Sequence, residues 1–196
     1  VVVMPAPWAH IPVDRHLRST GIVCTPWSGR CGAVSHTADM TGRAVAMGAV
    51  IALVIVYALG SGALVSTGSE WYAALDKPWW QPPSWFVGVI WPYNFAVIGI
   101  VGSVIAWQGA PARVVSFIVI LGVTVSLAIG WAYLFFSPHE LIWAAIALTA
   151  AAVLTVPLVV MAFAQEWWLG VLLLPYQAWV LIAASLSWGY VVQAGA

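Results

Sequence analysis

The chain carries very little charge for its length. Only six Lys and Arg and six Asp and Glu occur among 196 residues, and the formal net charge is zero. Nucleic-acid binding is excluded as a function, because it needs a basic patch that the chain lacks. Instead, 63% of the residues are hydrophobic and the mean hydropathy is +0.99. This composition is typical of an integral membrane protein.

Charge is also missing from every long apolar run. A helix needs roughly 20 apolar residues to cross the hydrocarbon core of a bilayer, and five runs are long enough: 44–66, 85–107, 114–136, 141–163 and 169–192. The sequence therefore predicts an all-α membrane protein, a bundle of five transmembrane helices. Ionisable residues at membrane depth usually mark an ion path, and the chain has no inverted repeat, so both absences disfavour a pump or ion-coupled transporter.

Cysteine is nearly absent. Cys24 and Cys31 are the two cysteines, and six residues separate them. Zinc sites favour closer pairs and need four ligands, and the nearby histidines show no matching spacing. We expect no metal site, and a disulfide between the two cysteines stays open.

Residues 1–39 differ from the rest in having no apolar run. A cleavable signal peptide needs one, so none is expected. This stretch is rich in proline and arginine, and we expect it to be a disordered tail ahead of a membrane domain at 40–196. Met40 immediately precedes the first run, so an alternative is that the natural start lies there.

The few basic residues predict an orientation. Arg43 and Arg113 flank the spans on the side of the N-terminal tail, whereas Lys77 is on the other side. The excess of basic residues favours a cytoplasmic N-terminus, in what we expect to be a bacterial cell membrane.

Tryptophan is abundant, and it concentrates between the end of the first span and the first two turns of the second. Residues 70–91 read EWYAALDKPWWQPPSWFVGVIW and hold five of the fourteen tryptophans. Lys77-Pro78 and Pro82-Pro83 stop any helix, and Ser84 is expected to cap the second span. Indole rings bury large areas, and prolines stiffen the backbone that presents them. We predict a lid loop over a binding site; the alternative for Trp79 and Trp80 is an aromatic belt at the membrane interface.

Two spans carry a polar and aromatic face. One helical face of the second span holds Trp91, Asn94, Phe95 and Ile98, and one of the last span holds Tyr176, Trp179, Ala183, Ser187 and Tyr190, after Pro175 interrupts the helical hydrogen bonding. Either face could serve only for helix packing, with Asn94 as an interhelical hydrogen-bonding group. Together they favour a shared cavity for a large, flat, apolar ligand.

The third span has a small residue at every fourth position. Gly122, Ser126 and Gly130 share this spacing, which lets two helices approach closely. A homodimer interface and packing within one bundle are both open. His139, alone in a later loop, is expected to be a surface residue.

Three ordered motifs resemble those of the TspO family, the tryptophan-rich sensory proteins related to the mitochondrial translocator proteins. They are WYAALDKPWWQPPSW with Trp91, WAYLFF at 131–136 and LPYQAW at 174–179. The resemblance implies a dimeric five-helix bundle with a pocket under the first loop. It also implies binding of tetrapyrroles such as protoporphyrin and haem, with no resident cofactor required.

The resemblance also assigns roles to particular positions. In some bacterial relatives tryptophans are associated with light-driven porphyrin breakdown, and these fall on Trp91 and Trp179; the lid tyrosine associated with ligand contact falls on Tyr72. An indole beside a photo-excited porphyrin is a suitable electron donor. Combined with the two helical faces, the residues expected to contact ligand are Tyr72, Trp79, Pro82, Pro83, Trp91, Asn94, Phe95, Ala128, Trp131, Phe135, Tyr176, Trp179 and Ala183.

The chain departs from the family pattern at the pocket floor. Ala128 stands where many members have asparagine, and Tyr133 stands where a proline is common. The segment after Trp91 also differs, and we hypothesise that Tyr93 and Asn94 compensate. The cholesterol motif near the C-terminus is incomplete, because no basic residue follows Tyr190, so no sterol site is expected there.

These patterns leave three functions in order of preference. The first is a membrane protein that binds tetrapyrroles and senses or regulates their level. The second is an enzyme that degrades porphyrin with light and oxygen in the same pocket. The third is a small-molecule transporter, which the lack of charge inside the spans disfavours.

Overall fold

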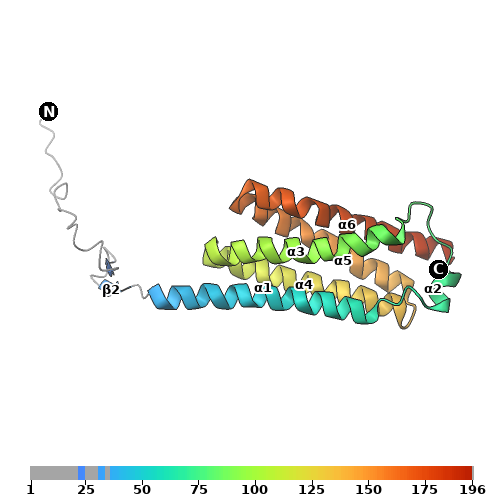
Figure 1. The fold of residues 1–196 in the computed structure, drawn as a ribbon, viewed down its shortest axis with the longest axis horizontal. Helices are drawn as coiled ribbons and strands as arrows, with labels where there is room; N and C mark the ends of the chain where they lie inside the picture. The colour runs from blue at the N-terminus through green and yellow to red at the C-terminus, as the bar shows by residue number, and fades with distance from the viewer. Residues whose placement is uncertain (1–21, 25–30, 34–35, 196) are drawn as a thin grey trace, which may run out of the picture. The chain divides into compact units, whose positions relative to one another are not determined.

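The computed structural model describes residues 22–24, 31–33 and 36–195. Five of its helices are long and apolar enough to cross a membrane (Figure 1). They are α1 (His36–Leu64), α3 (Ser84–Gln108), α4 (Pro111–Phe136), α5 (Leu141–Gln165) and α6 (Trp167–Gln193). The predicted five-helix membrane bundle is confirmed, and each span ends within a few residues of the expected position, except that α1 begins earlier.

Proline positions differ from expectation at two places. The helix α3 begins at Ser84 itself, with Pro83 as its N-cap and no side-chain cap hydrogen bond, so Ser84 is not the cap we predicted. The helix α6 continues through Pro175. Proline removes one backbone hydrogen bond, but packing against neighbouring helices keeps such spans intact in a membrane.

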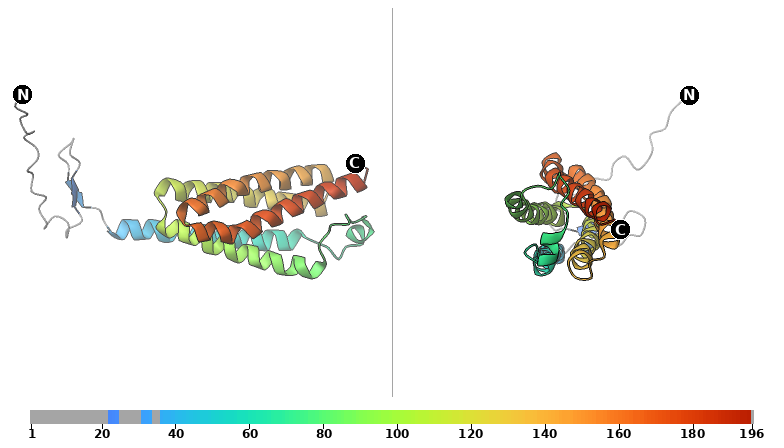
Figure 2. Two further views of the ribbon diagram at one scale, coloured as in Figure 1. Left: turned by 90° about the horizontal axis from the view of Figure 1, so that it is seen from above. Right: turned by 90° about the vertical axis from the view of Figure 1, so that its right-hand side faces the viewer.

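The helices pack side by side; short turns join α3, α4, α5 and α6 in order, whereas a longer segment that contains a short helix joins α1 to α3 (Figures 1 and 2). α5 packs between α4 and α6, and α3 packs against α6 and α4. Small residues allow these close contacts: Ala144, Ala145, Ala151 and Ala152 of α5 are all buried. Because α3 leads away from the loop that precedes it while α6 returns toward that end, the two helices run antiparallel.

Exposed tryptophans mark both ends of the bundle. Trp79, Trp85 and Trp143 lie at the end where α3 begins, and Trp107 and Trp167 lie at the other. Trp favours the two membrane–water interfaces, so these rings agree with a bundle that spans a bilayer. At the end of the bundle where α3 finishes, Arg43 donates to the Trp107 carbonyl at 2.7 Å. At the same end, Arg113 donates to the side-chain amide oxygen of Gln165 at 2.7 Å.

The N-terminal unit contains two short strands. β1 (Ile22–Cys24) and β2 (Cys31–Ala33) pair antiparallel, with Cys24 opposite Cys31. Regular structure was not expected here; Ile22 and Val23 are β-branched residues that favour strands. Most of the tail at 1–39 that we predicted to be disordered lies outside the described residues. The described residues also do not test whether the natural start is Met40.

The small-residue face of α4 lies along an apolar surface groove. Gly122 and Ser126 line it together with Leu53 and Val56 of α1, and the Ser126 hydroxyl donates to the Gly122 carbonyl at 2.9 Å. A side chain on Gly130 would meet no atom within 4 Å. The face is therefore only partly covered by α1, and the homodimer stays a prediction.

At Gly102 of α3, side chains from both α1 and α4 come close to the helix backbone. A Cβ on Gly102 would lie 2.6 Å from Val50 Cγ1 of α1 and 3.0 Å from Phe117 Cε1 of α4. Both neighbours are buried, at 0% and 1% exposure, so neither can move aside freely. The packing of α1 therefore depends on glycine at this position.

We predict that Gly102→Ala lowers the melting temperature of the purified protein in detergent by several degrees, because overpacking costs about 1–3 kcal/mol. Gly48→Ala is the matched control, since its Cβ would meet nothing within 4 Å. It should raise stability slightly, because alanine is the better helix former. Equal melting temperatures for the two variants would contradict this packing.

Candidate functional site

Residues 65–83 form a segment at one end of the bundle that we call the lid segment. It contains one short helix, α2 (Glu70–Ala74), which the sequence did not reveal. Ser69 caps α2, its hydroxyl accepting from the Tyr72 N–H at 3.2 Å. The helix does not continue after Leu75, because Lys77-Pro78 and Pro82-Pro83 disfavour helical backbone, and residues 78–81 form a turn in which the Gln81 N–H donates to the Pro78 carbonyl at 2.9 Å.

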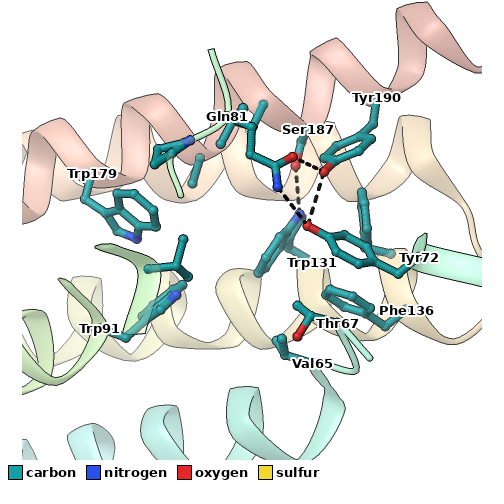
Figure 3. A pocket seen from close by; sticks show the side chains of 15 residues that line it. Val65, Thr67, Tyr72, Gln81, Trp91, Trp131, Phe136, Trp179, Ser187 and Tyr190 are labelled. Carbon is teal, nitrogen blue, oxygen red and sulfur yellow. Dashed lines mark hydrogen bonds between the residues drawn. The ribbon is translucent and has the colours of Figure 1, made fainter. Parts of the chain in front are cut away.

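A pocket lies between the lid segment and the ends of three spans (Figure 3). It holds about 650 Å³ of space free of atoms, part of it open to the outside. Its lining residues are Val65, Thr67, Tyr72, Gln81, Pro82, Val87, Trp91, Trp131, Phe135, Phe136, Trp179, Ala183, Leu186, Ser187 and Tyr190.

One end of the pocket is closed by a ring of three hydrogen bonds. The Gln81 amide donates to the Tyr72 hydroxyl at 3.3 Å, the Tyr190 hydroxyl donates to the Gln81 amide oxygen, and the two tyrosine hydroxyls are 3.2 Å apart (Figure 3). If Tyr72 donates to Tyr190, both hydroxyl hydrogens and one amide hydrogen of Gln81 are used within the ring. The ring ties the lid segment to the C-terminal end of α6, and each bond can strengthen the others.

The lid segment also rests directly on the backbone of α6. A Cβ on Gly189 would lie 2.7 Å from Pro78 Cγ and 2.9 Å from Trp80 Cζ2. Both of those atoms belong to rigid rings, so only glycine lets the segment come this close. Gly189 and Tyr190 together therefore position residues 78–81 over the pocket.

The deeper end of the pocket is aromatic. The Trp91 and Trp179 rings meet edge to face with centroids 6.2 Å apart. Phe95 stacks on Trp91, and Tyr57 of α1 contacts both rings edge to face. Phe86 packs on the ring of Trp179. Such contacts hold the two indoles in fixed orientations.

The wall from α4 joins the aromatic end to the polar ring. The Trp131 indole N–H donates to the Ser187 hydroxyl of α6 at 2.8 Å. Phe135 and Phe136 follow on the same wall, and their rings contact Tyr190 and Tyr72, respectively. This arrangement leaves a slot with apolar faces and hydrogen-bonding groups at the lid end.

Seven of the residues predicted to contact ligand line this pocket. They come from the lid segment and three different spans, so the pocket brings together motifs that are far apart in the sequence. These residues are Tyr72, Pro82, Trp91, Trp131, Phe135, Trp179 and Ala183.

Six predicted residues lie outside the pocket lining. Trp79 is 90% exposed, as the alternative of an interfacial belt requires, and Pro83 is also exposed. Phe95 lies behind Trp91. Asn94, Ala128 and Tyr176 are buried between helices below the pocket.

We hypothesised that Tyr93 and Asn94 compensate for the departures from the family pattern in the pocket. Neither residue lines the pocket, so neither does so by a lining contact. Tyr93 donates to the Leu172 carbonyl at 3.2 Å on the outer side of α3. Tyr133, the other departure from the family pattern, is 52% exposed and also faces outward.

Sequence reasoning missed the polar end of the pocket. Gln81 stands in the motif WWQPP, but nothing marked its side chain as inward-facing. Tyr190 and Ser187 were on the predicted face of the last span, so their spacing was the available signal. For Val65, Thr67 and Phe136 the sequence offered no signal except that they lie close to predicted residues along the chain.

His139 contacts the lid segment from the outside. Its ring stacks on Trp71 of α2 with centroids 3.8 Å apart, and its backbone has a positive φ of 62°. His139 is exposed, as expected for a surface residue.

No charged side chain lines the pocket, and no histidine, cysteine or methionine does either. The Lys77 ammonium lies just outside, 5.3 Å from the centroid of the Tyr72 ring. The described part of the chain contains no group of three or more potential metal-ligating side chains. The site is therefore suited to binding by aromatic contact and neutral hydrogen bonds.

Fold and site together define a five-span helical membrane protein with an aromatic pocket closed by the loop after its first span. The sequence pattern of the TspO/MBR family matches residues 49–193. The chain belongs to this family.

Relatives from three kinds of organism are similar to this chain in sequence. The human translocator protein is 34% identical over 73% of this chain and 86% of its own length. The tryptophan-rich sensory protein of Cereibacter sphaeroides is 28% identical over 69% of this chain and 87% of its own. The tryptophan-rich protein TspO of Archaeoglobus fulgidus is 32% identical over 70% of this chain and 89% of its own length.

We predict that Tyr190→Phe loosens the lid segment, because it removes two of the three hydrogen bonds in the ring. A loss of about 1–2 kcal/mol corresponds to roughly 5- to 30-fold faster amide exchange in residues 65–83. Hydrogen exchange read by mass spectrometry measures it.

Tyr133→Phe is the control, since Tyr133 is exposed on α4 and lies outside the pocket lining. Gly189→Ala should act like Tyr190→Phe by displacing Pro78 and Trp80. Unchanged exchange in both Tyr190→Phe and Gly189→Ala would show that these contacts do not hold the segment.

Proposed function

We propose that this protein binds tetrapyrroles in the pocket beneath the lid segment, and that binding serves to sense or regulate their level in the membrane. The observation that carries the proposal is the slot between Trp91, Trp131 and Trp179, closed at one end by Tyr72, Gln81 and Tyr190. Aromatic walls with few polar groups suit a flat, apolar ring system.

The two ends of the pocket suit the two ends of such a ligand. Porphyrins carry carboxylates on one edge, and burying a carboxylate without a partner is costly. The polar ring and the nearby Lys77 ammonium lie at the lid end, where carboxylates could keep contact with water. The opposite, apolar edge of the ligand would then face Trp91 and Trp179.

The pocket lining has no histidine, cysteine or methionine to coordinate the iron of haem. Tyr72 and Tyr190 are the lining residues with an oxygen of the kind that binds iron in some proteins, and both are engaged in the hydrogen-bonded ring. Affinity is therefore expected to come from contacts with the ring system and not from the metal.

A second candidate function uses the same pocket. The contact between Trp91 and Trp179 places two indoles side by side at its deep end. A photo-excited porphyrin there could take an electron from one indole, and molecular oxygen would be the oxidant that breaks down the ring. This is the light-dependent degradation proposed for the two tryptophans.

We predict that protoporphyrin IX and haem each quench the tryptophan fluorescence of the purified protein saturably in the dark. Their dissociation constants should agree within about threefold, because neither relies on a metal–protein bond. Trp179→Phe should reduce the quenching amplitude.

Trp79→Phe is the matched control for this titration. Trp79 is 90% exposed and lies outside the lining, so its loss should leave both the affinity and the site-specific quenching unchanged. Absence of saturable quenching in the unaltered protein would remove tetrapyrrole binding, and with it both candidate functions.

Degradation makes a separate prediction. Trp91→Phe and Trp179→Phe keep an aromatic wall, so porphyrin affinity should change less than about threefold, whereas bleaching under light and oxygen should be lost. Absorbance at the porphyrin Soret band measures bleaching. Trp143→Phe, an exposed tryptophan of α5, should bleach like the unaltered protein. Normal bleaching in both pocket variants would contradict the enzyme candidate.

A further inference from the structure

Four buried polar atoms near the deep end of the pocket have no hydrogen-bond partner among the described residues. They are both polar side-chain atoms of Asn94, the Tyr176 hydroxyl and the Trp179 indole nitrogen. The Tyr57 hydroxyl lies close enough to interact with the Tyr176 hydroxyl but does not complete a hydrogen bond to it by distance and angle. The three side chains are 0%, 1% and 4% exposed. Native proteins rarely leave such groups unsatisfied inside hydrocarbon, so the set calls for a partner.

Helix register brings these groups to adjacent levels. α3 runs away from the lid segment and α6 runs toward it, and Trp91 contacts Trp179 across the pair. The residue three positions after Trp91 in α3 lies about 4.5 Å deeper in the bundle than Trp91. The residue three positions before Trp179 in α6 lies deeper than Trp179 by the same distance. These two residues are Asn94 and Tyr176, which therefore lie at one level.

A second contact supports the same register. The Tyr93 hydroxyl reaches the Leu172 carbonyl at 3.2 Å, so the α3 segment next to Asn94 lies beside the α6 segment just before Tyr176. Tyr57 of α1 packs on Trp91 and neighbours Tyr176, which closes this region from the side. Asn94 and Tyr176 thus lie one level deeper than Trp91 and Trp179, the two indoles at the deep end of the pocket.

The chemistry of the three groups selects a neutral partner. The Asn94 amide and the Tyr176 hydroxyl can each donate and accept, whereas the Trp179 N–H can only donate. No Asp, Glu, Lys or Arg occurs in residues 84–108 of α3 or in α6. A charged group would be buried there without a counter-charge, which is costly, whereas a water, carbonyl or hydroxyl would be satisfied.

We propose that Asn94, Tyr176 and Trp179 form a hydrogen-bonding floor that binds one neutral polar group. Its source is either an ordered water or the carbonyl or hydroxyl end of a flat apolar molecule in the pocket. The second source rests on the proposed function of the pocket as a binding site. It orients the ligand, with neutral polar substituents at the floor and carboxylates at the lid end.

The test compares two probes of the same shape, 9-fluorenone and fluorene, which differ by one carbonyl. Tryptophan quenching gives both dissociation constants for the full-length protein in detergent. Asn94→Leu keeps the number and branching of the side-chain heavy atoms and removes the hydrogen-bonding groups, and Tyr176→Phe removes one hydroxyl. Thermal unfolding of each variant is followed in parallel.

The control is Thr124→Val in α4. Thr124 is also fully buried, but its hydroxyl is satisfied within its own helix, donating to the Ile120 carbonyl at 2.8 Å. The residue lies outside the pocket lining. It should leave the ratio of the two dissociation constants unchanged, and its shift in melting temperature is the reference for removing a satisfied buried hydroxyl.

If a ligand group occupies the floor, Asn94→Leu and Tyr176→Phe weaken fluorenone binding by roughly 5- to 10-fold and leave fluorene within twofold. If only water occupies it, neither probe's affinity changes, but both variants lose at least as much melting temperature as Thr124→Val. Either result supports the floor.

Two results overturn the proposal. The first is unchanged probe affinity with equal or higher melting temperatures in both variants, because removing truly unsatisfied groups stabilises a core. The second is an equal loss of affinity for fluorenone and fluorene, which indicates a purely steric role. Both are independent of the porphyrin titration, so failure of the floor and failure of tetrapyrrole binding can be told apart.

Discussion

The contact between the lid segment and α6 is the constraint on which the pocket depends. Pro78 and Trp80 lie against the bare backbone at Gly189, and Gln81 joins Tyr72 and Tyr190 in one hydrogen-bonded ring. A loop at the membrane interface has water available for its polar groups, so nothing but specific contacts keeps it over a cavity. Because glycine and tyrosine are consecutive in α6, one turn of that helix both admits the segment and holds it.

The pocket is polar at one end and aromatic at the other, and this asymmetry is its main chemical property. Tyr72, Gln81 and Tyr190 form the lid end, whereas Trp91 and Trp179 form the deep end. The proposed hydrogen-bonding floor adds a neutral polar level beneath the indoles. A ligand would therefore be sorted by the charge and position of its substituents as well as by the size of its ring system.

Hydropathy was sufficient to predict the bundle, because a spanning helix must be long, apolar and uncharged, and all five runs met that requirement. Periodicity placed Trp91 and Trp179 on the correct faces, since helical spacing is regular. It could not show that the lid segment turns Gln81 inward and Trp79 outward, because these residues form a turn between prolines and follow no helical or strand period. Nor could it separate Asn94 and Tyr176 from the pocket lining, because they share a helical face with lining residues and differ only in depth.

The most direct test of the account is an experimental structure of the protein with protoporphyrin IX bound, in membrane-like conditions and in the dark. The account predicts the macrocycle between Trp91, Trp131 and Trp179, with its carboxylates toward Tyr72, Gln81 and Lys77. A macrocycle bound outside this pocket, for example in the apolar groove between α1 and α4, would contradict the central claim.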